Sequence, residues 1–544
     1  MVMRKITLLL IAIVATNFLM AQTLQNSDLP IVIINTNGVG IPSEPKINGT
    51  MGIIYNGVGV RNSVTDPYNN YNGKIGIEVR GQSSQGFPMQ SYGIELRDNA
   101  GNSVDQSILG MSPENDWVLY APYTDKTLMH NFLAYTLSRS LGQWAPNCRY
   151  VEVVINGDYK GIYVLLEKIK RTKGRLDISN LHVNENTGDE LTGGYIISID
   201  KGANAWRSPY LTPYSTGGQT IQYSYIFPKI DSITVSQRNY IKNYTDSFEN
   251  AMAGIDFRDP VKGWRRFADE NAFMDYFMVN EISKNVDGYR LSSYLYKDKQ
   301  SKGQKGKLHV GPTWDYDLAF RNANYCNGSL TSGWAFEFNK VCGWDYWQVP
   351  FFWYQLWNDS AYKKQLHCRW VDVRQNVLSD NRIIAIIDSV AQLTAEARTR
   401  HFQRWPILGV YVWPNPNPIG ATYAEEITYL KDWVRARTAW IQNNLPDYGP
   451  CYNYLGNQTI SFSALTFPNP VSTQLTLVVK STKNQLMQIS LTDQLGRKLR
   501  RSPFQVITAE NKLLISMSGY AAGIYYLNCK GEGGDQLSLK VVKQ

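Results

Sequence analysis

Short hydrophobic runs, many of them alternating with polar residues, dominate the first 200 residues and predict β-strands. In 74–80, Ile75, Ile77 and Val79 recur every second residue, which is the period of a half-buried strand. A turn-rich loop separates this segment from 91–97, so 74–97 predicts a β-hairpin. The strands predicted on these grounds are 29–34, 74–80, 91–97, 149–155, 161–166 and 194–200.

Helical spacing appears in 126–141, where methionine and leucine recur every fourth residue, and it dominates from about residue 235. Further helices are predicted around 273–281, 383–390 and 427–441. A strand-rich first half followed by a helix-rich second half predicts an α+β fold. The order also fits a two-lobed core, with a cleft between a strand-rich N-lobe and a helical C-lobe.

The pattern changes again near the C-terminus. Residues 443–465 carry prolines and glycines without a clear period, which indicates a linker. Short alternating strands follow at regular spacing and predict a small immunoglobulin-like β-sandwich over 466–544. The core is then expected to occupy 22–442.

The first 21 residues have the three parts of a secretory signal peptide. Arg4 and Lys5 are positively charged, 6–14 is apolar, and Ala21 is a small residue suited to cleavage. The apolar run is too short to span roughly 30 Å of hydrocarbon, which makes an uncleaved membrane anchor the weaker alternative. The mature chain is therefore expected to be exported without a transmembrane anchor.

Export also bears on the six cysteines, since disulfides form in oxidising compartments. Cys326 and Cys342 could close a loop as a disulfide, although the sequence leaves the connectivity open.

The net charge of +9 is concentrated in one part of the chain. Residues 471–544 hold ten basic and four acidic residues, or +6, so the long core is nearly neutral. A nucleic-acid partner is not expected, because such proteins carry a basic patch on the domain that binds.

Two loops of the core carry carboxylates suited to phosphoryl transfer. Asp287 lies on a glycine-containing turn between a predicted helix and an apolar strand, where a general base would be rigidly held. Asp315 and Asp317 follow the strand 308–310, and both could reach one hard cation if the backbone turns. The simpler alternative for either loop is a solvent-exposed turn with helix-capping acids.

The C-terminal region resembles the type A sorting domain of the type IX secretion system of the Bacteroidetes. The matching segments are Phe467-Pro-Asn-Pro470, Leu491-Thr-Asp-Gln-Leu-Gly496, Gly523-Ile-Tyr-Tyr526 and Lys540-Val-Val-Lys543. The resemblance implies passage through the periplasm, contact with the type IX machinery and a secreted or cell-surface location. A generic immunoglobulin-like adhesion module is the alternative.

Residues 29–445 resemble the CotH family of atypical kinases. Six segments carry the resemblance: Val79-Arg-Gly-Gln-Ser-Ser84, Asn115-Asp-Trp-Val-Leu-Tyr120, 156–163 with Glu167-Lys168, Gly193-Gly-Tyr-Ile196, the Asn285/Asp287 loop and Trp314-Asp315. The resemblance implies a kinase-like fold. It also implies transfer of the ATP γ-phosphate to Ser or Thr of a secreted or cell-surface protein.

The resemblance also assigns roles to individual residues. Asp287 is expected to be the catalytic base, and Asp315 with Asp317 is expected to hold Mg²⁺ or Mn²⁺. The other residues expected at the ATP site are Arg80, Ser83, Ser84, Glu167, Lys168 and Asn285. Because neighbours on a strand point to opposite faces, at most one of Glu167 and Lys168 enters the cleft, and Glu167 is favoured.

Two positions depart from the family pattern. Met89 stands where family members often carry a lysine, and Ser292 stands where they often carry an asparagine that binds a second metal. Three lysines could replace the missing one at the phosphates: Lys74, Lys126 and Lys168.

These departures keep open a second function, that of a non-catalytic, pseudokinase-like surface-binding or scaffold protein. The aromatic residues of 343–347 and 411–413 could then stack on sugars or peptides, or simply fill the core of the helical half.

Overall fold

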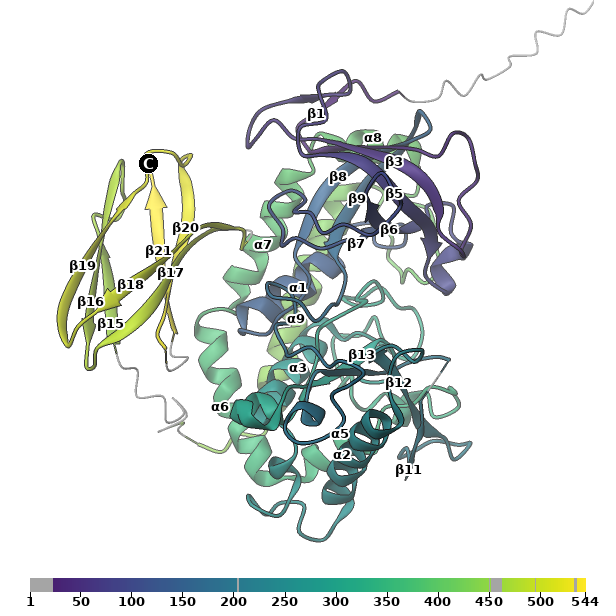
Figure 1. Ribbon diagram of the computed structural model, residues 1–544, viewed down its shortest axis with the longest axis vertical. Coiled ribbons are helices and arrows are strands. Elements are labelled where there is room, and N and C mark those ends of the chain that lie inside the picture. The colour runs from purple at the N-terminus through teal and green to yellow at the C-terminus, as the bar shows by residue number, and fades with distance from the viewer. Residues whose placement is uncertain (1–22, 203–204, 450, 452–461, 495, 533–535) are drawn as a thin grey trace, which may run out of the picture.

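The computed structural model describes residues 23–202, 205–449, 451, 462–494, 496–532 and 536–544 (Figure 1). The chain is a mixed α and β structure with a β-rich C-terminal region, which confirms the mixed class predicted from the sequence. The predicted signal peptide lies outside the described residues. Among the described helices, none is long and apolar enough to cross a membrane.

Seven strands close into a barrel near the N-terminus, in the order β2-β3-β5-β6-β7-β9-β8. Their bounds are β2 Ile31–Asn35, β3 Ile47–Ile54, β5 Tyr71–Arg80, β6 Ser91–Arg97, β7 Asp116–Tyr120, β8 Cys148–Ile155 and β9 Asp158–Glu167. A short pair, β1 Asn26–Ser27 and β4 Asn62–Ser63, lies outside the barrel. Parallel pairing of β2 with β8 closes it, a contact across more than a hundred residues that the sequence pattern did not predict.

Both strand pairs predicted in this part are confirmed. β5 and β6 pair antiparallel from Lys74 opposite Arg97 to Arg80 opposite Ser91, and β8 turns directly into β9. The alternating Ile75, Ile77 and Val79 of β5 are buried in the apolar core of the barrel, as their period requires.

The middle of the chain combines helices with a five-stranded sheet of its own, in the order β11-β12-β10-β13-β14. The strands are β10 Tyr195–Ile199, β11 Arg207–Leu211, β12 Thr220–Phe227, β13 Ser293–Lys297 and β14 Leu308–Val310. The α-helices are α1 His130–Ser140, α2 Val235–Ala253, α3 Glu270–Ser283, α4 Phe338–Val341, α5 Phe351–Asn358, α6 Ser360–Gln375, α7 Asp380–Leu393, α8 Ala397–Arg404 and α9 Tyr423–Asn444. Short 3₁₀ turns are η1 Ser83–Gly86, η2 Glu190–Thr192, η3 Trp264–Arg266 and η4 Gln300–Gly306. The second half is therefore not purely helical.

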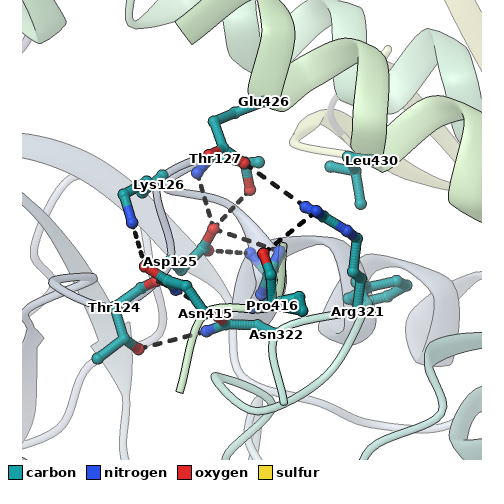
Figure 2. Close-up of a pocket in the computed structure, with 12 residues that line it drawn as sticks. Thr124, Asp125, Lys126, Thr127, Arg321, Asn322, Asn415, Pro416, Glu426 and Leu430 are labelled. Carbon is teal, nitrogen blue, oxygen red and sulfur yellow. Dashed lines mark hydrogen bonds and ion pairs between the residues drawn. The ribbon is translucent and has the colours of Figure 1, made fainter. Parts of the chain in front are cut away.

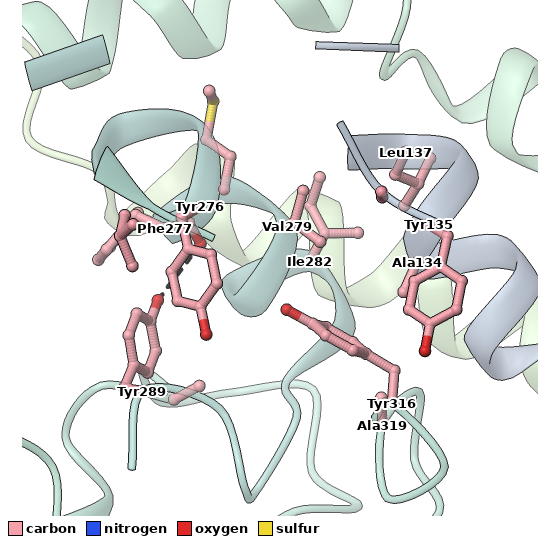
Figure 3. Packing of buried hydrophobic residues seen from close by; sticks show 14 of the residues in the cluster. Ala134, Tyr135, Leu137, Tyr276, Phe277, Val279, Ile282, Tyr289, Tyr316 and Ala319 are labelled. Atoms are coloured by element: carbon pink, nitrogen blue, oxygen red, sulfur yellow. Dashed lines mark hydrogen bonds between the residues drawn. The ribbon is translucent and has the colours of Figure 1, made fainter. Parts of the chain in front are cut away.

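Helix α3 is the centre of this part, since almost its whole length is buried. The side chain of Asp269 caps its N-terminus by accepting a hydrogen bond from the backbone of Ala272. Lys284 ends the helix in a left-handed conformation with φ 44°, which turns the chain into the loop that carries Asp287. Figure 3 shows side chains of α1 and α3 packed with Tyr289 and Tyr316, which lie on the two loops predicted to carry the acids.

Two further sheets, of three and four strands, enclose one apolar core in the C-terminal region. Their strands are β15 Phe462–Phe467, β16 Gln474–Ser481, β17 Gln485–Asp493, β18 Lys498–Val506, β19 Ala509–Ser516, β20 Gly523–Lys530 and β21 Gln536–Lys543. This sandwich lies beside α7 in Figure 1, where the guanidinium of Arg382 stacks on the ring of Tyr526 at 3.9 Å.

The quoted Pro-Asn-Pro segment has a clear structural task in the sandwich. The side chain of Asn469 donates to the backbone oxygen of Lys540 at 2.7 Å and accepts from the backbone nitrogen of Val542 at 2.8 Å. It therefore ties the entry of the domain to its terminal basic strand.

Two disulfides are formed among the described residues. Cys326 pairs with Cys342, as the sequence allowed, and Cys368 pairs with Cys451, which was not anticipated.

Candidate active site

One face of α1 holds the loop that carries Asp315. Three side chains of this helix, spaced four and three residues apart and therefore on one face, bond to the loop. The backbone nitrogen of Asp315 donates to Tyr135 Oη at 3.2 Å. The backbone nitrogen of Tyr316 donates to Asn131 Oδ1 at 2.5 Å. On the same loop, Thr313 Oγ1 donates to Ser138 Oγ at 2.8 Å. Asp315 itself has φ 63°, so the loop turns sharply at the acid.

Asn285 joins this loop to the one that carries Asp287. Its side-chain nitrogen donates to the backbone oxygen of Asp315 at 3.1 Å, and its side-chain oxygen accepts from the backbone nitrogen of Asp287 at 3.2 Å. Asn285 is buried. The two acidic loops, 30 residues apart in sequence, are thus brought together, and both ends of the Asn285 amide are used to hold them.

Gly288 makes the tight turn after Asp287 possible. A Cβ atom at this position would lie 2.3 Å from Asn280 Oδ1 and 3.0 Å from the backbone oxygen of Asn285. Asn280 Oδ1 also accepts a hydrogen bond from Tyr316 Oη at 3.0 Å, so a side chain at residue 288 would disturb both loops.

The acids share a strongly negative environment. Burial, followed by the charges of Asp287 and Asp200, raises the pKa of Asp315 to about 6, while Arg80 opposes the shift. Burial and the charges of Asp315 and Asp287 raise the pKa of Asp317 well above its usual value. Asp315 is thus affected by the charges of Asp287 and Asp200, and Asp317 by those of Asp315 and Asp287.

Asp200 is a member of this cluster that the sequence did not single out. It follows β10 and accepts a hydrogen bond from Ser292 Oγ at 3.3 Å. Burial is the main cause of its raised pKa, and Asp287 adds to the effect. Only the antiparallel pairing of β10 with β13, which sets Ile199 opposite Ser293, reveals this neighbour.

Arg290 is the second functional candidate that was missed. Its Nη2 lies 2.8 Å from Asp287 Oδ1, and its Nη1 lies 3.3 Å from Asp345 Oδ1. The guanidinium stacks on Phe338 at 4.0 Å, and the side chain is buried. The carboxylate of Asp287 is therefore oriented by a cation that is itself fixed on several sides.

Two cations approach from the barrel. Arg80, at the end of β5, lies over the ring of Trp314 at 5.5 Å, which places it beside the Asp315 loop. Lys168 directly follows β9, and burial lowers its pKa while the charge of Asp116 opposes that shift. The charge of Arg80 adds to the lowering of the Lys168 pKa.

Glu167 points away from these cations. Its Oε2 accepts hydrogen bonds from the backbone nitrogen and side-chain nitrogen of Asn147, at 3.0 and 2.9 Å, and the residue is fully buried. The carboxylate of Glu167 is thus engaged with Asn147, which does not support the sequence-based preference for Glu167 in the cleft. Which of the two side chains enters the cleft stays a prediction.

The other two candidate lysines are engaged elsewhere. Lys74 Nζ donates to the backbone oxygen of Asn99 at 2.9 Å, and Lys126 Nζ bonds to the side chain of Asn415. Met89 is buried in the apolar core of the barrel. Of these three lysines, Lys168 is the one whose pKa is affected by the charge of Arg80.

The predicted phosphate loop after β5 forms the compact turn η1. Gly81 has φ 101°, and a Cβ atom there would lie 1.9 Å from Ser84 Oγ, so this position requires glycine. The side chain of Ser83 is outside what the structure describes.

A small polar cavity supports the Asp317 end of the cluster (Figure 2). Its volume is about 30 Å³, enough for a water molecule and far too small for a nucleotide. Asn322 donates to the backbone oxygen of Asp317 at 2.8 Å and accepts from Asn415 at 2.7 Å. Burial lowers the pKa of Lys126, which lines the same cavity, to about 8.

The donor set suits Mg²⁺ only in part. Among the described residues, no three His, Cys, Asp or Glu side chains are grouped so that they could hold a metal ion. Mg²⁺ is commonly bound by one or two carboxylates, with waters and phosphate oxygens as the other ligands. Burial and, after it, the neighbouring carboxylate charges raise the pKa values of Asp315 and Asp317, and a bound cation would favour the charged form of both acids.

Comparisons with known proteins agree with the two resemblances. A family described as CotH kinase protein matches residues 77–441, and a secretion system C-terminal sorting domain matches 465–544. No curated protein matches the chain. A crystal structure of dimeric latent PorU from Porphyromonas gingivalis is 18% identical over 15% of this chain and 9% of that chain, with a TM-score of 0.14.

Proposed function

Since the chain belongs to the CotH kinase family, we propose that it is a protein kinase that transfers the γ-phosphate of ATP to Ser or Thr of secreted or cell-surface proteins. The type IX sorting domain indicates secretion or a cell-surface location and implies interaction with the type IX machinery. The barrel would serve as the N-lobe and the helical part as the C-lobe. One observation carries the proposal: Asn285 bonds to both acidic loops and brings Asp287 and Asp315 into one charge cluster.

Asp287 is the proposed general base. The ion pair with Arg290 holds its carboxylate in one orientation, as proton abstraction from an acceptor hydroxyl requires. Arg290 does not need to touch the substrate for this role, so it is a positioning residue.

Asp315 and Asp317 are the residues that would hold Mg²⁺ or Mn²⁺, with Asp200 as a neighbouring acid oriented by Ser292. The bound cation would neutralise charge on the phosphates. Arg80 and Lys168 offer positive charge from the barrel side, which suits the phosphates of ATP.

The test compares label incorporation from γ-labelled ATP by the full-length protein and by Asp287→Asn, with Mg²⁺ and dephosphorylated casein as a general acceptor. Removing the base while keeping its shape should lower the rate by about a hundredfold or more. Asp388→Asn, at a largely exposed acid on α7, is the matched control and should leave the rate unchanged.

Equal incorporation by the wild type and Asp287→Asn would contradict the assignment. Saturable ATP binding with no transfer by either protein would instead favour the non-catalytic surface-binding alternative.

A further inference from the structure

Four exposed aromatic side chains lie on two loops around the Asp287–Arg290 ion pair. Trp344 and Tyr346 are 70% and 51% exposed, and Tyr411 and Trp413 are 54% and 47% exposed. Several large aromatic rings exposed together are unusual and mark a binding surface. These four residues are called the aromatic face below.

The loop with Trp344 and Tyr346 is attached directly to the proposed base. Arg290 Nη1 donates to the backbone oxygen of Trp347 at 2.9 Å, while its Nη2 contacts Asp287. On its outer side, the backbone oxygen of Gly343 accepts a hydrogen bond from the backbone nitrogen of Thr216 at 2.8 Å. This loop is therefore held on both sides.

The loop with Tyr411 and Trp413 reaches the same place through Tyr325. The rings of Tyr325 and Trp413 stack at 6.0 Å with 7° between their planes, and Asn324 donates to Tyr411 Oη at 3.0 Å. Tyr325 directly precedes Cys326, whose disulfide partner Cys342 leads into the loop that Arg290 ties to Asp287.

The disulfide Cys326–Cys342 joins the segment that follows Tyr325 to the loop with Trp344 and Tyr346, with 5.7 Å between the Cα atoms. Cys326 follows Tyr325, and Cys342 lies two residues before Trp344. The two loops are therefore linked through the Tyr325 segment, by this disulfide on one side and by the stacking of Tyr325 on Trp413 on the other. The aromatic face lies with the loops of the helical part, whereas Arg80 and Lys168 approach the acids from the barrel.

Three polar groups beside the aromatic face are bonded within the protein. Arg290 is paired with Asp287 and Asp345, Asn324 bonds to Tyr411, and Tyr346 Oη accepts from Arg207 at 3.1 Å. Carbohydrates need several convergent polar groups as well as stacking, whereas an apolar side chain needs only the rings. The surface therefore favours a polypeptide with uncharged, apolar side chains.

We propose that the aromatic face binds the acceptor polypeptide through a large apolar or aromatic side chain close to the hydroxyl that is phosphorylated. This inference rests on the proposed kinase function and specifies its substrate class.

The test measures peptide binding without nucleotide, by fluorescence anisotropy on the full-length protein. Two labelled decapeptides each contain a single Ser near the middle. In one peptide the residues two positions before and two positions after this Ser are Phe, and in the other peptide they are Ala. The Phe peptide should bind about tenfold more tightly or better. Trp413→Ala and Trp344→Ala should each remove this preference, whereas Tyr68→Ala, at a 40% exposed ring of the barrel part, should retain it.

Equal affinity for the two peptides, or a preference unchanged in both Trp variants, would overturn the proposal. The proposal would also be overturned if the protein bound laminarihexaose, lost this binding in both Trp variants and showed no preference between the two peptides. That result would identify a carbohydrate-binding surface. Because no nucleotide is present, failure here is distinguishable from failure of the Asp287 assay.

Discussion

At the scale of single residues, the site depends on which way each side chain points. Glu167 and Lys168 are adjacent, yet Glu167 is bonded to Asn147 in the interior, whereas the pKa of Lys168 is affected by the charge of Arg80. The amide of Asn285, a residue expected at the cofactor, bonds to both acidic loops. A residue's type limits its chemistry, but its neighbours decide its task.

Glu249 allows a residue-scale prediction about pH. It is fully buried and accepts hydrogen bonds from Tyr223 Oη at 2.9 Å and Ser208 Oγ at 3.0 Å. Burial raises its pKa to about 7, with Asp246 adding to the shift and Lys242 opposing it. Between pH 4.5 and 7 the folded state binds a proton that the unfolded state has lost, so this group makes the protein less stable as pH rises through that window.

Glu249→Gln should remove this contribution, up to roughly 3 kcal/mol across the window. Urea unfolding at pH 5 and pH 7 measures it, and Glu532→Gln, at an exposed acid, is the control. An identical difference between the two pH values in the wild type and Glu249→Gln would contradict the prediction.

At the scale of elements, the four helices predicted individually from the hydrophobic period correspond to α1, α3, α7 and α9, whereas the other helices were not predicted one by one. The period also explains why one face of α1 can hold the Asp315 loop, since Asn131, Tyr135 and Ser138 share that face. It could not predict what this face contacts. The partner loop lies about 180 residues further along the chain.

The contact between α3 and α9 gives an element-scale prediction. Arg437 of α9 and Glu281 of α3 form a buried ion pair at 2.8 Å. The carboxylate also accepts from Tyr289 Oη and from the backbone nitrogens of Ala335 and Phe336. Arg437→Met leaves this buried acid without its cation and should cost about 3–5 kcal/mol of unfolding free energy.

Chemical denaturation measures that loss, and the double variant Arg437→Met/Glu281→Gln is its control. Removing both charges should restore a large part of the stability, because the cost comes mainly from the unpaired charge. A double variant less stable than Arg437→Met would argue against this reason.

At the scale of the whole molecule, the sandwich has its own apolar core and contacts the rest through a few side chains. Beside the stacking of Arg382 on Tyr526, Ser389 Oγ donates to Gln494 Oε1 at 3.4 Å. The acids, Arg80 and Lys168 all belong to the larger part. The sorting domain is therefore expected to be dispensable for both stability and catalysis of that part.

A chain ending at residue 455 keeps Cys451 and its disulfide. Its unfolding temperature should agree, within about 2 °C, with that of the same larger part in the full-length protein. Calorimetry of both proteins checks this, and casein labelling should be equal. A decrease well beyond that margin would show that the sandwich stabilises the kinase-like part.

The sequence by itself determined the elements with a clear hydrophobic period, the two family resemblances and the two acidic loops, and it allowed the Cys326–Cys342 pairing. These are local properties, since a period, a turn or a motif is contained in a short stretch of chain. Tertiary structure alone decided the parallel closure of the barrel, the bonding of Glu167 to Asn147, and the positions of Asp200 beside Ser292 and of Arg290 beside Asp287. Each of these depends on packing or strand pairing between distant segments, and the hydrophobic pattern of one segment does not specify its partner.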